Sequence, residues 1–196
     1  MRDAENIRAL EAQARPDLMG FICWERSSRH VSEVPTYLPE CQRVGVFVNP
    51  TIDYVRERIQ SLGLSFVQLH GSESPEFCRE VQSEGVKVIK AISVATPEDI
   101  QLSERYQEAA DLLLFDTKCP SVGGSGQQFD WSVLIHYQGS LPFLLSGGIG
   151  PGDAERVRQW QHPRCIGIDI NSRFELAPAM KDVAAVARFI GETRLG

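Results

Sequence analysis

The sequence predicts an α/β protein built from parallel strands and surrounding helices, and it favours a closed (β/α)8 barrel over an open doubly wound sheet. Seven apolar runs are short, nearly continuous and bounded by glycine, proline or polar residues, which is typical of strands covered on both faces. Segments with the spacing of amphipathic helices separate these runs. Such an alternation implies parallel strands joined by right-handed crossovers. The number of runs favours the barrel, although a complete barrel of this type has eight strands.

The predicted strands share short lengths and a high content of valine, isoleucine, leucine and phenylalanine. They cover residues 17–23, 43–48, 65–69, 86–92, 111–116, 142–146 and 165–170. Each is followed by polar residues or glycine, so the point at which each strand ends can be read from the sequence.

The helical segments are marked by apolar spacing and by start signals. The first covers Ala4–Ala14, where Ile7 and Leu10 recur at the helical spacing. Starts with a capping residue or an early proline are predicted at Thr51, Ser74-Pro75-Glu76, Thr96-Pro97-Glu98 and Gly150-Pro151-Gly152-Asp153. Residues 129–134 are expected to be helical, and a last helix is expected over residues 177–190. Residues 1–196 then form one domain in which a helix precedes seven β-α units.

Composition argues against several classes of function. The net charge of −6 does not suit a surface that follows nucleic-acid phosphates, which needs clustered lysine and arginine. No apolar run approaches the roughly 20 residues that span a bilayer, and the first residues lack the apolar core of a signal peptide, so we expect a cytoplasmic protein. The cysteines lack metal-site spacing and are odd in number, which predicts reduced thiols and no metal site. They are Cys23, Cys41, Cys78, Cys119 and Cys165.

Candidate site residues follow the predicted strands, because both architectures bind ligands at the carboxyl ends of their strands. Gly147 and Gly148 precede the helix start at Pro151, on the penultimate strand, and this pattern predicts a phosphate site on backbone amides. The alternative is a glycine turn that only reverses the chain. The GGSG segment at 123–126 lies in a long loop that is either a lid or a connector.

Polar residues that follow the other predicted strands each have two possible roles, one in a site and one in the structure. Asp116 ends an apolar run, and partial desolvation would favour the neutral acid needed to donate a proton, although it could also brace a loop. Arg29 is a fork for a carboxylate or phosphate, or a surface arginine. His70 is catalytic, or a strand-end histidine bonded to its neighbours. Asp169 and Ser172 belong to the substrate pocket or brace the last loop.

Several motifs, taken together and in order, resemble the phosphoribosylanthranilate isomerase family. They are MRDAENI, DLMGFI, SSRHV, VGVFVN, VQLHGSE, VIKAI, FDTK, GGSGQQFDW, LSGGIGPGDAE and GIDINSRFE, and they span essentially the whole chain. The resemblance implies a TIM barrel that catalyses an Amadori rearrangement in tryptophan biosynthesis with no metal or organic cofactor. The expected ligand is a small phosphosugar, and the expected state is a monomer or homodimer.

The resemblance also implies roles for individual residues. Asp116 would protonate the ring oxygen of the sugar, and Arg29 would hold the carboxylate of the anthranilate. From their strand-end positions we expect His70 and Asp169 to belong to the substrate pocket as well. The phosphate would lie on backbone amides around Gly147, Gly148, Asn171 and Ser172.

The sequence departs from the family pattern in three places. Ser27-Ser28-Arg29 stands where the family often has S-P-R, and Asn171-Ser172-Arg173 stands where it often has S-S-G. Arg173 then lies near the phosphate or points away. The family's first strand ends in K-x-C-G, whose cysteine is the general base, and the printed sequence starts just after that motif.

Three expectations follow from this last departure. The strands at 17–23 and 165–170 should have unpaired edges, and the chain as printed should be impaired in turnover. Cys23 aligns with an aromatic position and is a poor substitute base. The alternative functions are a non-catalytic phosphosugar-binding barrel and an indole-glycerol-phosphate synthase, which would need a catalytic lysine, for which Lys90 is the central-strand candidate.

Overall fold

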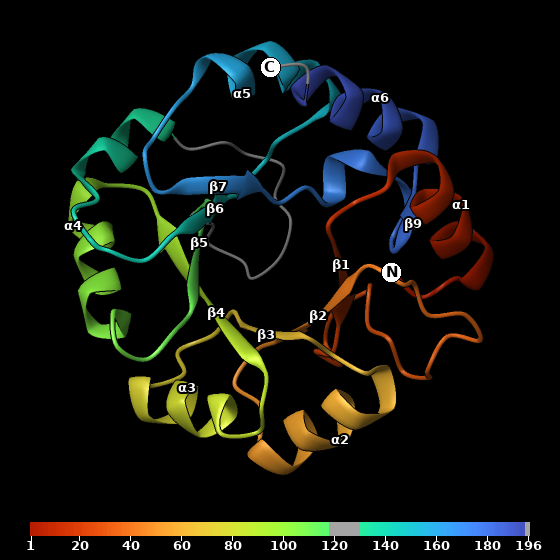
Figure 1. The fold of residues 1–196 in the computed structure, drawn as a ribbon, viewed down its shortest axis with the longest axis horizontal. Coiled ribbons are helices and arrows are strands. Elements are labelled where there is room, and N and C mark those ends of the chain that lie inside the picture. The colour runs from red at the N-terminus through yellow and green to blue at the C-terminus, as the bar shows by residue number, and fades with distance from the viewer. Residues whose placement is uncertain (118–129, 195–196) are drawn as a thin grey trace.

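The computed structural model describes residues 1–117 and 130–194 of the chain. Its centre is a sheet of seven parallel strands in which each strand pairs with the next one along the chain. The strands are β1 Leu18–Ile22, β2 Gln42–Phe47, β3 Phe66–Leu69, β4 Lys87–Val94, β5 Leu112–Thr117, β6 Phe143–Leu145 and β7 Cys165–Ile168. The sheet curls about a central axis with the helices outside it, so the predicted barrel of seven visible strands is confirmed (Figure 1).

Most of the predicted helix starts are confirmed. The helices are α1 Ala4–Ala14, α2 Ile52–Leu62, α3 Pro75–Gln82, α4 Pro97–Gln101, α5 Ala154–Gln159 and α6 Val183–Thr193. Short 3-10 helices are η1 Leu102–Tyr106, η2 Trp131–His136, η3 Pro151–Asp153 and η4 Ser172–Phe174. The side chains of Thr51 and Ser74 accept hydrogen bonds from the first turns of α2 and α3, which is why these helices begin where the sequence predicts.

Two predictions about local structure are wrong. The connection between β1 and β2 contains turns and no helix, so the β-α alternation fails at its first repeat. The last helix begins at Val183 rather than at 177, and Asp182 caps it. Residues before it form a short hairpin of β8 Glu175–Ala177 and β9 Met180–Lys181, with Pro178 in the connection between the two strands. The helix expected over residues 129–134 is confirmed from Trp131 onward, as the 3-10 helix η2.

The helices of the outer layer form a contact across the gap between the two ends of the sheet. Within the described residues β1 and β7 are the two ends of the sheet, as the sequence predicted for their edges. On the outside, α1 and α6 pack against each other and join the first and last parts of the described chain (Figure 1). No helix in residues 1–117 and 130–194 is long and apolar enough to cross a membrane.

Two apolar clusters hold these layers. The larger one lies between the sheet and the helices and includes Ile7, Val55 and Phe143. The smaller one consists of inward-facing strand residues such as Ile89 and Leu114. Because adjacent residues of a strand face opposite sides, strands such as β4 and β5 contribute to both clusters, which explains their nearly continuous apolar sequences.

Candidate active site

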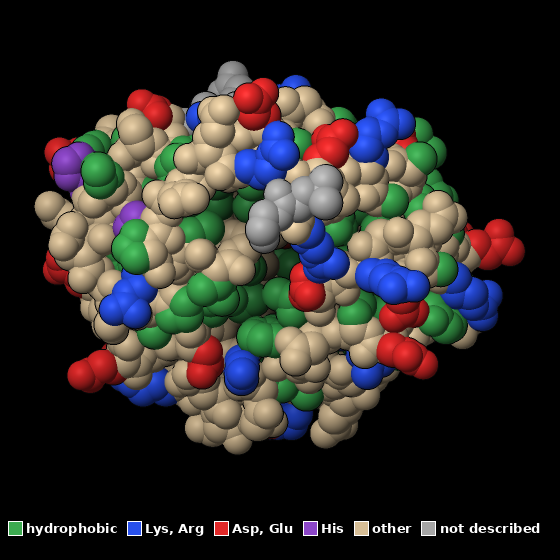
Figure 2. All heavy atoms as spheres, turned by 45° about the horizontal axis from the view of Figure 1, so that its top comes forward, with side chains coloured by type: hydrophobic (Ala, Val, Ile, Leu, Met, Phe, Trp, Pro, Cys, Tyr) green, Lys and Arg blue, Asp and Glu red, His purple; other side chains and the backbone are tan. Residues whose placement is uncertain are grey.

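A cavity of about 1340 Å³ runs through the interior of the barrel. All eight residues predicted to form the site line it: Arg29, His70, Asp116, Gly147, Gly148, Asp169, Asn171 and Ser172. Figure 2 shows one hollowed face of the molecule, with hydrophobic side chains gathered around the hollow. The parallel strands explain this convergence, because their carboxyl ends all point to the same rim.

Asp116 lies at the end of β5, and each of its carboxylate oxygens has a polar neighbour. The backbone N–H of Thr117 donates to Oδ1 over 2.8 Å, and His70 Nε2 lies 3.3 Å from Oδ2. The side chain of Asp116 is 28% exposed. Its surroundings are therefore polar and partly open to solvent, whereas the sequence suggested an apolar environment.

His70 connects Asp116 to a residue that the sequence did not single out. The amide nitrogen Nε2 of Gln68 lies 2.9 Å from His70 Nδ1. Gln68 is buried on β3 and lines the cavity. A polar residue in the middle of an otherwise apolar strand was the signal that could have identified it.

The glycine turn after β6 packs directly against Asp116. Gly147 and Gly148 have φ angles of 92° and 68°, a region that side chains with a Cβ rarely adopt. A Cβ added to Gly147 would meet the Thr117 side chain and would lie 2.7 Å from the Thr117 nitrogen and 3.0 Å from Asp116 Oδ1. The turn requires glycine both for its backbone conformation and for this close approach.

Asp169 supports the same turn from β7. The hydroxyl of Ser146 donates to Asp169 Oδ2 over 2.8 Å. Burial raises the pKa of Asp169, and the bond from Ser146 opposes this shift only in part. Asp169 thus braces the turn and also faces the cavity, so the two readings of this residue are compatible.

Arg29 is bound by Glu175, a second residue that the sequence did not identify. Arg29 Nε lies 2.8 Å from Glu175 Oε2, and Arg29 Nη2 lies 2.7 Å from the same oxygen. Burial alone would raise the pKa of Glu175, but the bonds from Arg29 and Lys181 outweigh it and the pKa is lowered. Glu175 therefore occupies the edge of the guanidinium formed by Nε and Nη2. The edge formed by Nη1 and Nη2 is the one that a second carboxylate could approach.

Lys181 joins this ion pair to the turn after β7. Its Nζ lies 3.1 Å from Glu175 Oε1 and donates to the backbone oxygen and to Oδ1 of Asn171 over 2.9 and 2.6 Å. Arg173 Nη1 donates to Gly148 O over 3.3 Å, so Arg173 lies against the glycine turn rather than pointing away. Two basic side chains, Lys181 and Arg173, therefore lie beside the turns predicted to bind the phosphate, and Lys181 is paired there with Glu175.

Lys90 and Cys23, the two residues weighed as alternative catalytic groups, do not line the cavity. Lys90 is buried and bonded to Glu73, to Leu69 O and to Gly71 O. Cys23 is buried in the outer cluster, and none of the four described cysteines lines the cavity. The lysine needed for an indole-glycerol-phosphate synthase is therefore not provided by Lys90.

Parts of the predicted site lie outside the described residues. They are the GGSG segment at 123–126 and Cys119. Within residues 1–117 and 130–194 no group of three histidine, cysteine or acidic side chains is arranged to hold a metal ion.

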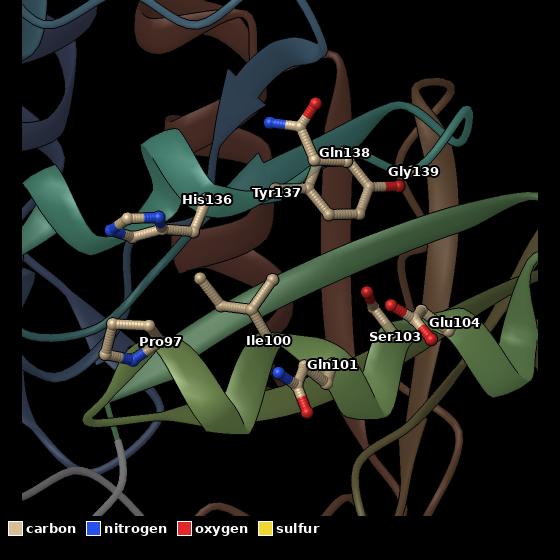
Figure 3. Close-up of a pocket in the computed structure, with 9 residues that line it drawn as sticks. All are labelled: Pro97, Ile100, Gln101, Ser103, Glu104, His136, Tyr137, Gln138 and Gly139. Carbon is tan, nitrogen blue, oxygen red and sulfur yellow. The ribbon is translucent and has the colours of Figure 1, made fainter.

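A second, smaller cavity of about 380 Å³ lies in the outer layer (Figure 3). Residues of α4 and η1, such as Ile100 and Ser103, face residues at the end of η2, such as His136 and Tyr137. None of the predicted site residues lines it, so it is separate from the interior cavity.

Comparison with known proteins gives a consistent result. Residues 2–192 match the family described as N-(5'phosphoribosyl)anthranilate (PRA) isomerase. The N-(5'-phosphoribosyl)anthranilate isomerase of Phocaeicola vulgatus is 49% identical over 195 residues, which cover 99% of this chain and 95% of the relative. The crystal structure of phosphoribosyl anthranilate isomerase from Thermotoga maritima is similar with a TM-score of 0.84 at 31% identity, covering 99% of this chain and 95% of that one.

A further solved structure is a phosphoribosyl anthranilate isomerase in complex with reduced 1-(o-carboxyphenylamino)-1-deoxyribulose 5-phosphate. It has a TM-score of 0.79 and 27% identity, and the match covers 99% of this chain and 98% of that chain.

Proposed function

This chain belongs to the N-(5'-phosphoribosyl)anthranilate isomerase family, and we propose that its interior cavity is the active site of that isomerase. The reaction converts N-(5-phosphoribosyl)anthranilate to 1-(2-carboxyphenylamino)-1-deoxyribulose 5-phosphate and belongs to tryptophan biosynthesis. One observation carries the proposal: Asp116, the glycine turn at Gly147 and the Arg29 guanidinium share one cavity. An acid, an anion-binding turn and a carboxylate fork are the groups that this substrate needs.

In the proposed reaction Asp116 donates a proton to the ring oxygen of the ribose. The bond between C1 and that oxygen breaks, and the nitrogen of the anthranilate forms a double bond to C1. A base then removes the proton from C2, and the resulting enolamine tautomerises to the ketone, so substrate and product are isomers. Thr117 N–H and His70 lie within reach of the carboxylate that Asp116 becomes. The group that accepts the C2 proton is not assigned to a described cysteine, since none lines the cavity.

The phosphate is proposed to bind where the turns after β6 and β7 meet. Gly147 and Gly148 supply backbone that a phosphate can approach closely, and Asn171 and Ser172 lie on the neighbouring turn. Lys181 and Arg173 add positive charge beside these turns. This arrangement supports the predicted phosphate-binding residues.

Replacing Gly147 by alanine is expected to raise the KM for the phosphorylated substrate by about tenfold or more. The new Cβ would meet the Thr117 side chain and strain a backbone with φ of 92°, so the turn must shift. Steady-state kinetics measure the effect. Gly85→Ala is the matched control, since Gly85 has φ of 84° but nothing lies within 4 Å of the added Cβ. An unchanged KM for Gly147→Ala would contradict the proposal that the phosphate binds at this turn.

Arg29 is proposed to bind the substrate carboxylate through its Nη1 and Nη2 groups, because Glu175 occupies the Nε edge. Glu175→Gln is expected to raise KM several-fold and to change kcat little, since the fork loses its orientation while the acid is untouched. Glu84→Gln is the control, because Glu84 binds Arg56 in the same way on the surface. A large fall in kcat without a change in KM would contradict the role given to Arg29.

A second candidate function is non-catalytic binding of a phosphosugar. It is favoured by one observation, that no described cysteine lines the cavity. Turnover of the phosphoribosylanthranilate and binding of the reduced product analogue, measured on the same sample, separate the two. Product formation that Asp116→Asn abolishes supports the isomerase, whereas binding without turnover supports the alternative.

We also propose a cytoplasmic location and a monomer or homodimer, and the free thiols of the described cysteines suit that compartment.

A further inference from the structure

Gln68, His70 and Asp116 are successive polar neighbours that line the cavity. We propose that Gln68 fixes His70 as the neutral Nε2–H tautomer, so that His70 always presents a donor to Asp116. Gln68 and His70 are then positioning residues for the proposed proton donor, and in this respect the inference rests on the proposed function.

The two neighbours of the imidazole determine which nitrogen holds the proton. The amide nitrogen of Gln68 can only donate, and it lies 2.9 Å from His70 Nδ1, so Nδ1 must accept. On the other side, Nε2 lies 3.3 Å from Asp116 Oδ2, and this oxygen can only accept once Asp116 has given up its proton, as the proposed reaction requires. A neutral imidazole has one donor and one acceptor, and only the Nε2–H form satisfies both neighbours.

The surrounding structure holds all three groups in place. Gln68 is buried in the middle of the sheet, where β3 pairs with β2 on one side and β4 on the other. The backbone N–H of His70 donates to Phe47 O over 2.8 Å. Directly after His70, the N–H of Gly71 donates to the Glu73 carboxylate, which is itself bound to buried Lys90. The ring therefore sits on a rigid strand end.

The tautomer matters for the proposed reaction because Asp116 must become a carboxylate. When Asp116 gives up its proton, Oδ1 faces the Thr117 N–H and Oδ2 faces the His70 Nε2–H. The other tautomer would turn the lone pair of Nε2 toward Oδ2, and two acceptors would then oppose each other. Gln68 prevents this by keeping a donor against Nδ1.

The first test is direct observation of the ring by 15N NMR, at a pH above the ordinary titration range of imidazole and without substrate. The chain has 4 histidines, and the His70 signals are those that disappear in a His70→Asn variant. We expect the Nε2–H pattern in the unmodified protein. In Gln68→Glu the carboxylate can only accept, so the ring should change to Nδ1–H or become an imidazolium. An unmodified protein with the Nδ1–H pattern, or an unchanged pattern in Gln68→Glu, would overturn the proposal.

The second test is kinetic. Gln68→Met keeps the length of the side chain and removes the donor, and we expect kcat to fall roughly ten- to a hundredfold with little change in KM, a smaller loss than removal of a general acid causes. Gln107→Met is the control, because Gln107 bonds Ser140 and Tyr137 in the outer layer and should leave both kcat and the His70 signals unchanged. If Gln68→Glu does not fold, the spectrum of the unmodified protein and of Gln68→Met still decides the tautomer.

The two proposals fail in different ways. A protein without isomerase turnover whose His70 shows the Nε2–H pattern, altered only by the Gln68 variants, would reject the function and retain the positioning of the ring. An active isomerase with the opposite tautomer, or with unchanged kcat in Gln68→Met, would reject the positioning and retain the function.

Discussion

Asp116→Asn is expected to lower kcat by about 10²–10⁴-fold, the range over which a general acid contributes to a rate. Asparagine keeps the size of the side chain and an oxygen that can accept from the Thr117 N–H, but it has no acidic proton to give to the ring oxygen. The kinetics of the purified variant and its affinity for the reduced product analogue should therefore separate, with turnover lost and binding retained.

Asp130→Asn is the matched control for this prediction. Asp130 is exposed and caps η2 by accepting from the Ser132 N–H, away from the cavity. It should leave kcat unchanged. An Asp116→Asn variant with nearly normal turnover would show that another group protonates the ring oxygen.

Lys90→Met is expected to destabilise the protein by about 3–5 kcal/mol, the cost of leaving one partner of a buried ion pair without the other. The side chains of Lys90 and Glu73 are each 2% exposed, and Lys90 Nζ lies 2.9 Å from Glu73 Oε2. Urea unfolding followed by circular dichroism measures the change. The Glu73→Gln/Lys90→Met double variant should recover part of the loss, because no unpaired charge then remains buried.

Arg56→Met tests the same chemistry on the surface. Arg56 binds Glu84 with comparable distances, but its side chain is 44% exposed, so its removal should change the unfolding midpoint little. Equal effects of Lys90→Met and Arg56→Met would contradict the importance of burial. Because Glu73 also accepts from the backbone of Gly71, next to His70, we expect Lys90→Met to lower turnover as well.

The site could be predicted in outline because its residues occupy strand ends. His70, Asp116 and the glycine turn at Gly147 were visible as polar residues or glycines that follow an apolar run, and Arg29 as part of the polar loop after the first run. Parallel strands must bring such ends together. The roles of these residues remain predictions. Glu175 was not visible, because nothing near it in the sequence shows that it binds Arg29, which is 146 residues away.

Helix boundaries were likewise predicted correctly only where neighbouring residues determine them. Thr51 and Ser74 were identified because capping depends on residues within one turn of the helix start. The turns between β1 and β2 and the hairpin before α6 were missed, since these short segments have no helical or strand period of their own.

The sequence by itself determined the order of the seven strands, most of the helix starts and the rim on which the acid, the glycine turn and the arginine lie, because period, capping and strand ends are properties of neighbouring residues. Only the tertiary structure decided what each of these groups contacts: Gln68 on His70, Glu175 on Arg29, and Lys90 on Glu73 rather than in the cavity. The reason is physical. A hydrogen bond or ion pair depends on distances of about 3 Å between side chains that the fold brings together, and such distances are not encoded in local spacing.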